Sequence, residues 1–268
     1  TREVTGWKKI RRFRFLNLCV LLGVMEGQKT EGIPWGPHKA PVFLDLDDFS
    51  LSFEKDNDNY IYRRDGAGAS VEKVVAAQKS ALLLSPVEPL HLPAAISNML
   101  MIELEQPLIV EPRSNRTIFV TYPLEIAVII TPSRADQYVI DLFTLNRTKF
   151  TLYGNVRDGK VCKYWKSRVY NDKPVVNPLQ QGVMKLDVQN AGNRWAEVHK
   201  AVFSAYGMKM VYGPDLVLLS GQMKIINELN AETIFNDPPL PSGMKKAFEQ
   251  FNLRLLSQQG KTLMEEGY

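Results

Sequence analysis

Side chains that could support metal chemistry are scattered along this chain of 268 residues. Asp45, Asp47 and Asp48 could offer oxygen ligands to a divalent cation, but they lack the glycine and the distal glutamate of a calcium-binding loop. Asp45 and Asp47 fall on one face of an expected strand, so a solvated strand face is the simpler interpretation. Three histidines are too dispersed to show metal-ligand spacing: His38, His91 and His199. We therefore predict no metal site and no cofactor.

Paired carboxylates could catalyse hydrolysis, one as general acid and the other as general base. The candidates in the stretch 100–130 are Glu103, Glu105, Glu111 and Glu125. In a hydrolase, several of them would converge with Asp45 and His91 in a pocket; on an edge hairpin, the same charges would discourage aggregation. Cys162 and His199 are a conceivable nucleophile and base, but no third orienting residue or glycine-flanked elbow accompanies them. We predict no catalytic residue and keep the hydrolase as an alternative.

The best candidate for an interaction surface is the basic segment 147–173, in which aromatic residues are interleaved with lysines and arginines. The expected strand 161–170 would bring basic and aromatic side chains close together. The predicted surface consists of Lys163, Tyr164, Trp165, Lys166, Arg168 and Tyr170. Such a surface could hold single-stranded nucleic acid, an acidic protein or a lipid headgroup. The alternative is a solvated strand whose long side chains cover one face of a sheet.

Composition and charge are those of an ordinary soluble globular protein. The chain is 45% hydrophobic and 23% charged, with a formal net charge of +4. Residues 1–25 hold six basic residues and one acidic residue, so the rest of the chain carries a net charge of −1. This near-neutral body argues against a polyanionic partner such as nucleic acid. Two cysteines far apart in sequence indicate no disulfide framework and fit a reducing cytoplasm.

Residues 1–31 form a basic and apolar leader with the outline of a signal peptide or a short anchor. Its apolar run, 15–24, is too short to span a bilayer, which needs about 20 apolar residues. No small-x-small cleavage motif follows the run. The alternatives are an upstream in-frame extension ahead of a true start at Met25, and a docked strand or helix. Membrane association and the native status of the leader therefore stay open.

The stretch 100–130 is expected to form the core of the fold. Its first arm alternates apolar and acidic residues, and its second arm keeps one apolar register over 118–130. Turn-forming residues at 112–115 separate the arms. We predict a long β-hairpin that continues into a further strand. The chain could change sheets at residues 122–123, because Pro123 cannot donate a ladder hydrogen bond.

Further strands are separated by turn signals at the spacing of a β-sandwich. Residues 182–212 repeat the design of the first core stretch, with Asn193-Arg194 in the place of Asn115-Arg116. The sequence therefore predicts a mainly β fold, with two tandem antiparallel β-sandwich-like halves and a C-terminal helix. The expected division is a leader at 1–31, a first β domain at 32–135, a second at 136–235, and a proline linker and helix at 236–268.

The predicted helix covers residues 242–259. Met244, Phe248, Phe251 and Leu255 fall at helical spacing and would form one apolar stripe. We expect this stripe to pack on the domain or on a partner.

Five segments carry a resemblance to a known family: ALLLSPVEPLHLP, MIELEQPLIVEPRSNRTIFVTYPLEIAV, TLYGNVRDGKVCKYWKS, GVMKLDVQNAGNRWAEVHKAVFSAYGMKMVY and the closing LMEEGY. Over nearly the whole chain after Met25 the sequence resembles an archaeal family of unassigned function, domain of unknown function four-three-two. The family pattern closes on Met-Glu-Trp-Gly, whereas this chain has Glu266 in place of the tryptophan. The resemblance implies an archaeal, cytoplasmic protein associated with genes of small mechanosensitive channels. It assigns no activity to any residue.

The absence of a catalytic motif favours a non-enzymatic protein-interaction module. The expected partner is an unknown protein, with a membrane channel and a second copy of this chain among the candidates. β-Sandwiches commonly present edges and end loops to partners. One alternative is a carbohydrate- or small-molecule-binding protein, or a hydrolase using the hairpin carboxylates. A nucleic-acid binder acting through segment 147–173 is the less favoured alternative.

Overall fold

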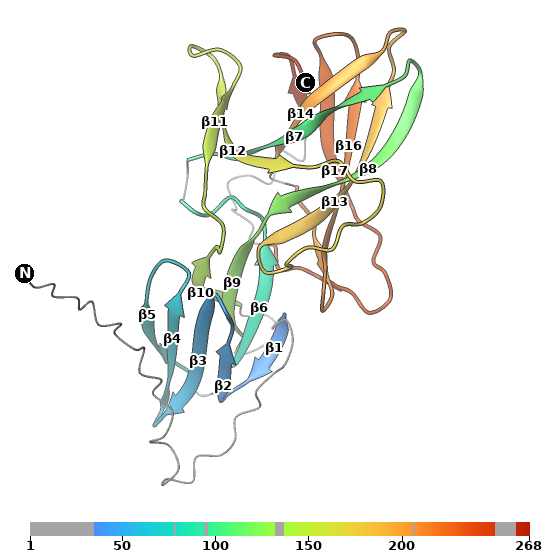
Figure 1. Ribbon diagram of the computed structural model, residues 1–268. Coiled ribbons are helices and arrows are strands. Elements are labelled where there is room, and N and C mark those ends of the chain that lie inside the picture. Colours follow the sequence, from blue (N-terminus) through green and yellow to red (C-terminus); the bar gives the residue numbers. More distant parts are fainter. Residues whose placement is uncertain (1–34, 78, 94–95, 132–136, 206, 250–260) are drawn as a thin grey trace, which may run out of the picture.

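Strands dominate the structure, a computed structural model that describes residues 35–77, 79–93, 96–131, 137–205, 207–249 and 261–268 (Figure 1). These residues form nineteen strands in four sheets, and none of them lies in a helix. The predicted mainly β fold is confirmed. The predicted C-terminal helix is wrong in the part of its range that the structure describes, and the predicted leader lies outside the described residues.

The first sandwich, the lower body in Figure 1, consists of two antiparallel four-stranded sheets. One is a meander of β2 (Val42–Asp45), β3 (Phe49–Asp56), β4 (Asn59–Gly66) and β5 (Val71–Ala76). The other has the order β1-β6-β9-β10 and contains β1 (Gly36–Lys39), β6 (Ala81–Val87), β9 (Glu125–Thr131) and β10 (Tyr138–Phe143). Asn57 turns the β3–β4 hairpin with a φ of 53°, a left-handed value that asparagine tolerates.

Alternating side chains from both sheets fill the first sandwich. Phe53 stacks on Tyr60 with ring centroids 4.9 Å apart, and both face Leu82 and Ile126 in one buried cluster. The alternation of Phe49, Leu51 and Phe53 along β3 therefore places these three side chains in the core.

A buried polar network joins the two sheets of the first sandwich. Arg64 Nε on β4 donates to Asp141 Oδ2 on β10 at 2.7 Å, and the Tyr62 hydroxyl donates to the same oxygen at 2.7 Å. Arg64 also donates to the Gly66 carbonyl at 2.6 Å and lies 4.5 Å from the centroid of the Phe143 ring. Burial, reinforced by Asp141, raises the pKa of Tyr62. The network is satisfied by partners from both sheets, as a buried charge requires.

The second sandwich, the upper body in Figure 1, has a four-stranded sheet in the order β11-β12-β7-β14 and a seven-stranded sheet. The smaller sheet contains β7 (Met99–Val110), β11 (Phe150–Tyr153), β12 (Lys160–Ser167) and β14 (Ala196–Ser204). The larger contains β8 (Ser114–Pro123), β13 (Gln181–Asn190), β15 (Val211–Tyr212), β16 (Val217–Ile225), β17 (Ala231–Asn236), β18 (Lys245–Lys246) and β19 (Thr262–Met264). Each sheet of the second sandwich contains one parallel pairing: β7 with β12 in the smaller sheet and β13 with β16 in the larger one. The prediction of antiparallel sheets therefore holds only in part.

The predicted long hairpin is instead a β-arch. β7 belongs to the smaller sheet and β8 to the larger one, so the two arms face each other across the core instead of pairing. β13 and β14 form a second arch in the same way, and the two arches lie side by side. Asn190 joins them, since its side-chain amide donates to the carbonyls of Val110 (3.1 Å), Glu111 (3.1 Å) and Arg194 (2.8 Å).

The chain crosses between the sandwiches at residues 122–125. β8 ends at Pro123 in the second sandwich and β9 begins at Glu125 in the first, which confirms the predicted change of sheet. β9 and β10 complete the first sandwich, whereas β7 and β8 belong to the second. The two sandwiches therefore take strands alternately along the chain.

The predicted helix range is not helical over its described part, residues 242–249, which contains a turn at 242–243 and the short strand β18 (Lys245–Lys246). β18 pairs with β15, so the backbone of Lys245 and Lys246 is paired with a neighbouring strand. A helix at these residues would not allow this pairing. Met244 packs on the outer face of the larger sheet, while Phe248 packs on the outer face of β6 and β9 in the first sandwich. Of the expected stripe, Met244 and Phe248 therefore cover two separate surfaces, whereas Phe251 and Leu255 lie outside the described residues.

Candidate binding sites

Within the predicted basic and aromatic surface, Lys163 is buried. Its Nζ lies 2.6 Å from Glu125 Oε1 and donates to the Leu92 carbonyl at 2.8 Å. The Glu125 carboxylate also accepts backbone hydrogen bonds from His91 (3.0 Å) and Leu92 (3.1 Å). Burial raises the pKa of Glu125, although Lys163 acts in the opposite direction. This ion pair joins β12 of the second sandwich to β9 of the first and leaves Lys163 unable to meet a partner.

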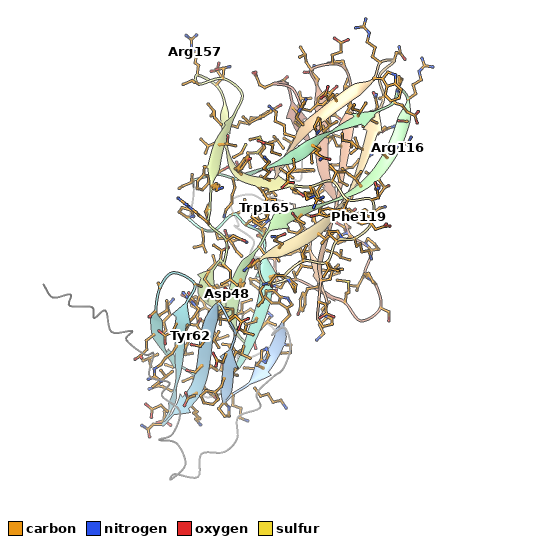
Figure 2. All side chains as sticks on the ribbon, in the orientation of Figure 1. Asp48, Tyr62, Arg116, Phe119, Arg157 and Trp165 are labelled. Atoms are coloured by element: carbon orange, nitrogen blue, oxygen red, sulfur yellow. The ribbon has the colours of Figure 1, made fainter. Side chains whose placement is uncertain are left out.

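The aromatic residues of the predicted surface serve the fold. The Trp165 indole nitrogen donates to Thr121 Oγ1 at 3.0 Å, which ties β12 to β8 (Figure 2). Tyr164 is half-buried, and its pKa is raised by this burial and then by Glu103. Tyr170 exchanges two backbone hydrogen bonds with Phe119 of β8.

Only the cations at positions 166 and 168 remain exposed among the six predicted residues. Arg168 Nε lies 4.0 Å from a Glu105 carboxylate oxygen, and its guanidinium lies 6.0 Å from the Tyr170 ring centroid. Lys166 is paired in register with Glu103 of β7. Both cations therefore stand close to acidic residues, which weakens any attraction to an anionic partner.

The carboxylates of the hydrolase hypothesis do not converge. Glu125 and His91 lie together at the junction of the sandwiches, where Glu125 is held by Lys163. Asp45 lies on the outer face of the meander, and Glu103 and Glu105 lie on β7. No group of three metal-ligating side chains occurs in the part of the chain that the structure describes. A hydrolase built on these residues has no pocket in which they could act together.

Cys162 and His199 also lack the environment of a catalytic pair. Burial raises the pKa of the Cys162 thiol to about 11, opposite to the shift that activates a nucleophile. His199 is exposed and lies 3.5 Å from Glu197. The free thiol is therefore a core side chain.

A projecting hairpin, β11–β12, carries the exposed part of the basic segment. Leu152 pairs with Val161 on its outer face, and Phe150 shares that face two residues away. These side chains remain exposed at 39% (Leu152), 44% (Val161) and 37% (Phe150). Ser97 Oγ donates to the Val161 carbonyl, which brings the exposed Ile96 next to the same face. Apolar side chains thus gather on the outer side of an edge strand.

The tip of this hairpin is firmly built. Asn155 Oδ1 accepts hydrogen bonds from the backbone of Arg157 (2.8 Å) and Asp158 (3.0 Å), which fixes the turn. Val156 is 95% exposed at this tip, and Figure 2 places Arg157 at the end of the hairpin, away from both sandwiches. The strand end next to the turn is anchored as well, because the Tyr153 hydroxyl donates to the Gly267 carbonyl at 3.0 Å.

We define the hairpin surface as these exposed apolar residues and the exposed cations of the same hairpin, of which Lys149 and Lys160 alternate onto the opposite strand face, where Lys160 pairs with Tyr153. It consists of Phe150, Leu152, Val156, Val161, Lys149, Arg157 and Lys160. This region belongs to the predicted basic segment 147–173, but its apolar residues were not among the six predicted residues. The pairing of Lys163 with Glu125 is not visible in the local sequence. The alternation of Phe150 and Leu152 was the available signal.

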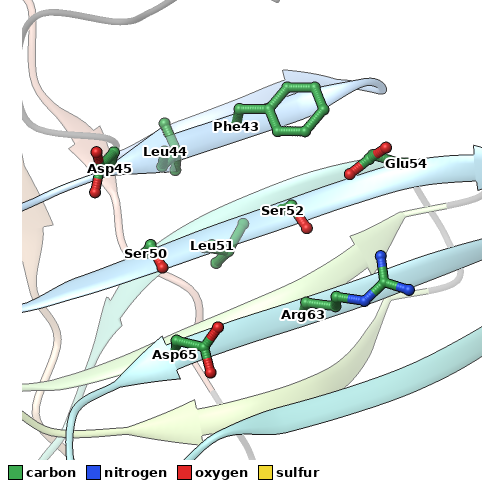
Figure 3. A pocket seen from close by; sticks show the side chains of 9 residues that line it. All are labelled: Phe43, Leu44, Asp45, Ser50, Leu51, Ser52, Glu54, Arg63 and Asp65. Carbon is green, nitrogen blue, oxygen red and sulfur yellow. The ribbon is translucent and has the colours of Figure 1, made fainter. Parts of the chain in front are cut away.

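A shallow basin of about 570 Å³ lies on the outer face of the meander (Figure 3). Ser50 and Ser52 of β3 form its floor, because they are the smallest side chains on this face. Longer side chains from all three strands surround them: Phe43, Asp45, Glu54, Arg63 and Asp65. The alternation of β3 puts Phe49, Leu51 and Phe53 in the core and Ser50, Ser52 and Glu54 on the opposite, outer face.

A second hollow, of about 580 Å³, lies where the second arch meets the β16–β17 turn. Trp195 and Leu229, both exposed, contribute apolar walls, and Tyr268 closes one side by donating to the Asn227 carbonyl at 3.0 Å. It holds no convergent set of charged groups beyond the exposed pair of Arg194 and Glu228.

No stretch of the described chain is a helix long and apolar enough to cross a membrane. No curated protein and no solved structure matches the sequence. A family model does match, over residues 34–265, which is most of the chain and includes both sandwiches. The chain therefore belongs to the family described as Protein of unknown function (DUF432), as its resemblance implied.

Proposed function

We propose that the protein is a non-enzymatic interaction module of an archaeal cell, which docks through the hairpin surface onto a protein partner. One observation carries this proposal: a rigid edge hairpin presents apolar side chains to solvent while its opposite face is anchored in the second sandwich. Tyr153 and Cys162 supply that anchored face and are buried. Exposed apolar groups on an ordered projection are typical of a docking site.

The charge of the hairpin surface indicates the kind of partner. Arg157 is exposed at the tip beside the acidic Asp158, and Lys149 and Lys160 are exposed on the strand face opposite to Leu152 and Val161. A partner with acidic groups around an apolar recess would complement both features. β11 pairs only with β12 among the strands of the described chain, so its free edge could add a strand of the partner.

The test is affinity capture of the tagged protein from cells of its source organism, membrane fraction included, after mild cross-linking. The L152D/V156D variant removes the apolar contacts, and the K149E/R157E variant reverses the charge. Val74→Asp is the matched control, because Val74 is a 66% exposed valine on β5, remote from the hairpin. We expect a protein that the wild type and the control retain and that both hairpin variants lose.

Retention of the same proteins by the hairpin variants would contradict the proposal, as would a preparation without any retained protein. Two other macromolecules must be examined with purified protein: anionic phosphatidylglycerol vesicles and single-stranded RNA. Binding to either that disappears in K149E/R157E and falls steeply with salt would replace the protein partner by a polyanion.

A further inference from the structure

The basin on the outer face of the meander has the chemistry of a ligand site. A ligand bound there would not depend on the docking role of the hairpin. Asp45 pairs with Ser50, and Ser50 pairs with Asp65, so these three side chains form one row across β2, β3 and β4. Phe43, Ser52 and Arg63 form the adjacent row in the same way. Residues of two rows on a paired sheet hold fixed positions relative to one another.

The polar groups of the basin include both donors and acceptors. Two serine hydroxyls donate and accept, and the carboxylates of Asp45, Glu54 and Asp65 accept. Arg63 is oriented by Glu72, whose carboxylate lies 2.7 Å from Nε on the neighbouring strand. That contact engages Nε, and the two terminal guanidinium nitrogens are the donors that would meet a ligand (Figure 3).

Phe43 adds an apolar surface to this polar set. It is 38% exposed, and its cross-strand neighbour Ser52 is too small to cover the ring. An aromatic ring beside convergent hydrogen-bonding groups suits a ligand with apolar C–H faces and hydroxyl edges.

We propose that this basin binds a neutral carbohydrate. The sugar would rest one C–H face on Phe43, donate hydroxyl hydrogen bonds to Asp45 and Asp65, and accept from Arg63. The volume of the basin, about 570 Å³, is within the range of small-ligand sites, and the open shape of the basin fits a few units of an oligosaccharide.

The charge of the lining argues against other ligand classes. Three carboxylates against one guanidinium repel phosphate, sulfate and other anions. Arg63 and the phenyl ring would contribute little to a metal ion, and no three metal-ligating side chains come together in the described residues. A polyamine would use the carboxylates alone and leave Arg63 opposed to it.

The experiment uses the full chain and defined probes. Saturation-transfer NMR followed by titration calorimetry would measure binding of cellohexaose, mannohexaose and maltohexaose, with spermidine and glucose 6-phosphate for comparison. Phe43→Ala removes the platform, and Ser52→Tyr fills the basin without removing a charged group. Val74→Ser, on the same sheet but outside the basin, is the control. Thermal melts of each variant verify that the sheet is folded.

We expect at least one neutral hexasaccharide to bind, with an affinity at least tenfold lower for Phe43→Ala and Ser52→Tyr and unchanged for Val74→Ser. Absence of binding to all three hexasaccharides would overturn the proposal. So would binding that survives both basin variants, or a preference for spermidine or for glucose 6-phosphate over the neutral sugars.

Discussion

The two buried ion pairs among the described residues differ in what they connect and in which partner can lose its charge. Arg64 and Asp141 join the two sheets within the first sandwich, and Lys163 and Glu125 join one sandwich to the other. The arginine is permanently charged. Burial already raises the pKa of Glu125, so that carboxyl group can become neutral when its partner is lost. Loss of the first pair should therefore destabilise the fold equally at every pH, whereas the effect of losing the second pair should depend on pH.

The largest effect is expected from Asp141→Asn, which leaves the buried Arg64 guanidinium without its counter-ion. We expect the free energy of unfolding to fall by about 3–5 kcal/mol. Because Arg64 cannot deprotonate, the loss should be the same at pH 5.5 and pH 8. Urea unfolding at both pH values measures it. Glu72→Gln, which removes the partner of the exposed Arg63, is the control, and a loss no larger than that of this control would contradict the account.

A somewhat smaller and pH-dependent effect is expected from Lys163→Met, which leaves Glu125 buried without its cation. The loss should be about 3 kcal/mol at pH 8. Removing Lys163 removes an influence that lowers the pKa of Glu125, so the raised pKa rises further. A carboxyl group with a raised pKa in the folded state binds its proton more tightly there, so stability falls as pH rises through the folded pKa. The variant should therefore recover stability at pH 5.5, and equal losses at both pH values would argue against it.

These two pairs also mark the limit of what the sequence could predict. The apolar register of 118–130 and the turn residues indicated strands and reversals, and Pro123 indicated a sheet change at 122–123. Whether two strands that flank a turn pair or face each other is decided by partners far along the chain. β8 pairs with β13, some seventy residues away in the chain, as the Thr117–Asp187 contact illustrates. The hairpin prediction could not anticipate this.

The same reason explains the errors at the candidate sites. Lys163 has the sequence context of an exposed basic strand, and only Glu125, in another sheet, shows that it is buried. Met244 and Phe248 have helical spacing, yet the surfaces they cover belong to different sandwiches. The basin depends on Phe43 and Arg63 lying in one row, which requires the register of three strands.

The two arches of the second sandwich are joined by the neutral side chain of Asn190 instead of an ion pair. Asn190→Ala removes an amide that satisfies carbonyls of both arches, and should lower the free energy of unfolding by about 1–3 kcal/mol. Asn193→Ala, at an exposed position of the same turn, is the control. Denaturant midpoints compare the two, and an equal effect would mean that the arches are held by packing alone.

The smallest effect on stability is expected at the hairpin tip. Val156→Asp changes a side chain that is 95% exposed, so the free energy of unfolding should change by no more than about 0.5 kcal/mol. The tip should thus matter for docking and not for folding. A large loss of stability would show instead that Val156 packs on the protein itself.

Site-specific photo-cross-linking in the source cells tests the docking account most directly. A benzophenone amino acid would replace Val156 at the hairpin tip in one strain and the exposed Val74 of the first sandwich in another. The account predicts a discrete adduct with a single protein from position 156 and none from position 74. The same adducts from both positions, or no adduct from position 156, would contradict the assignment of the hairpin as the docking surface.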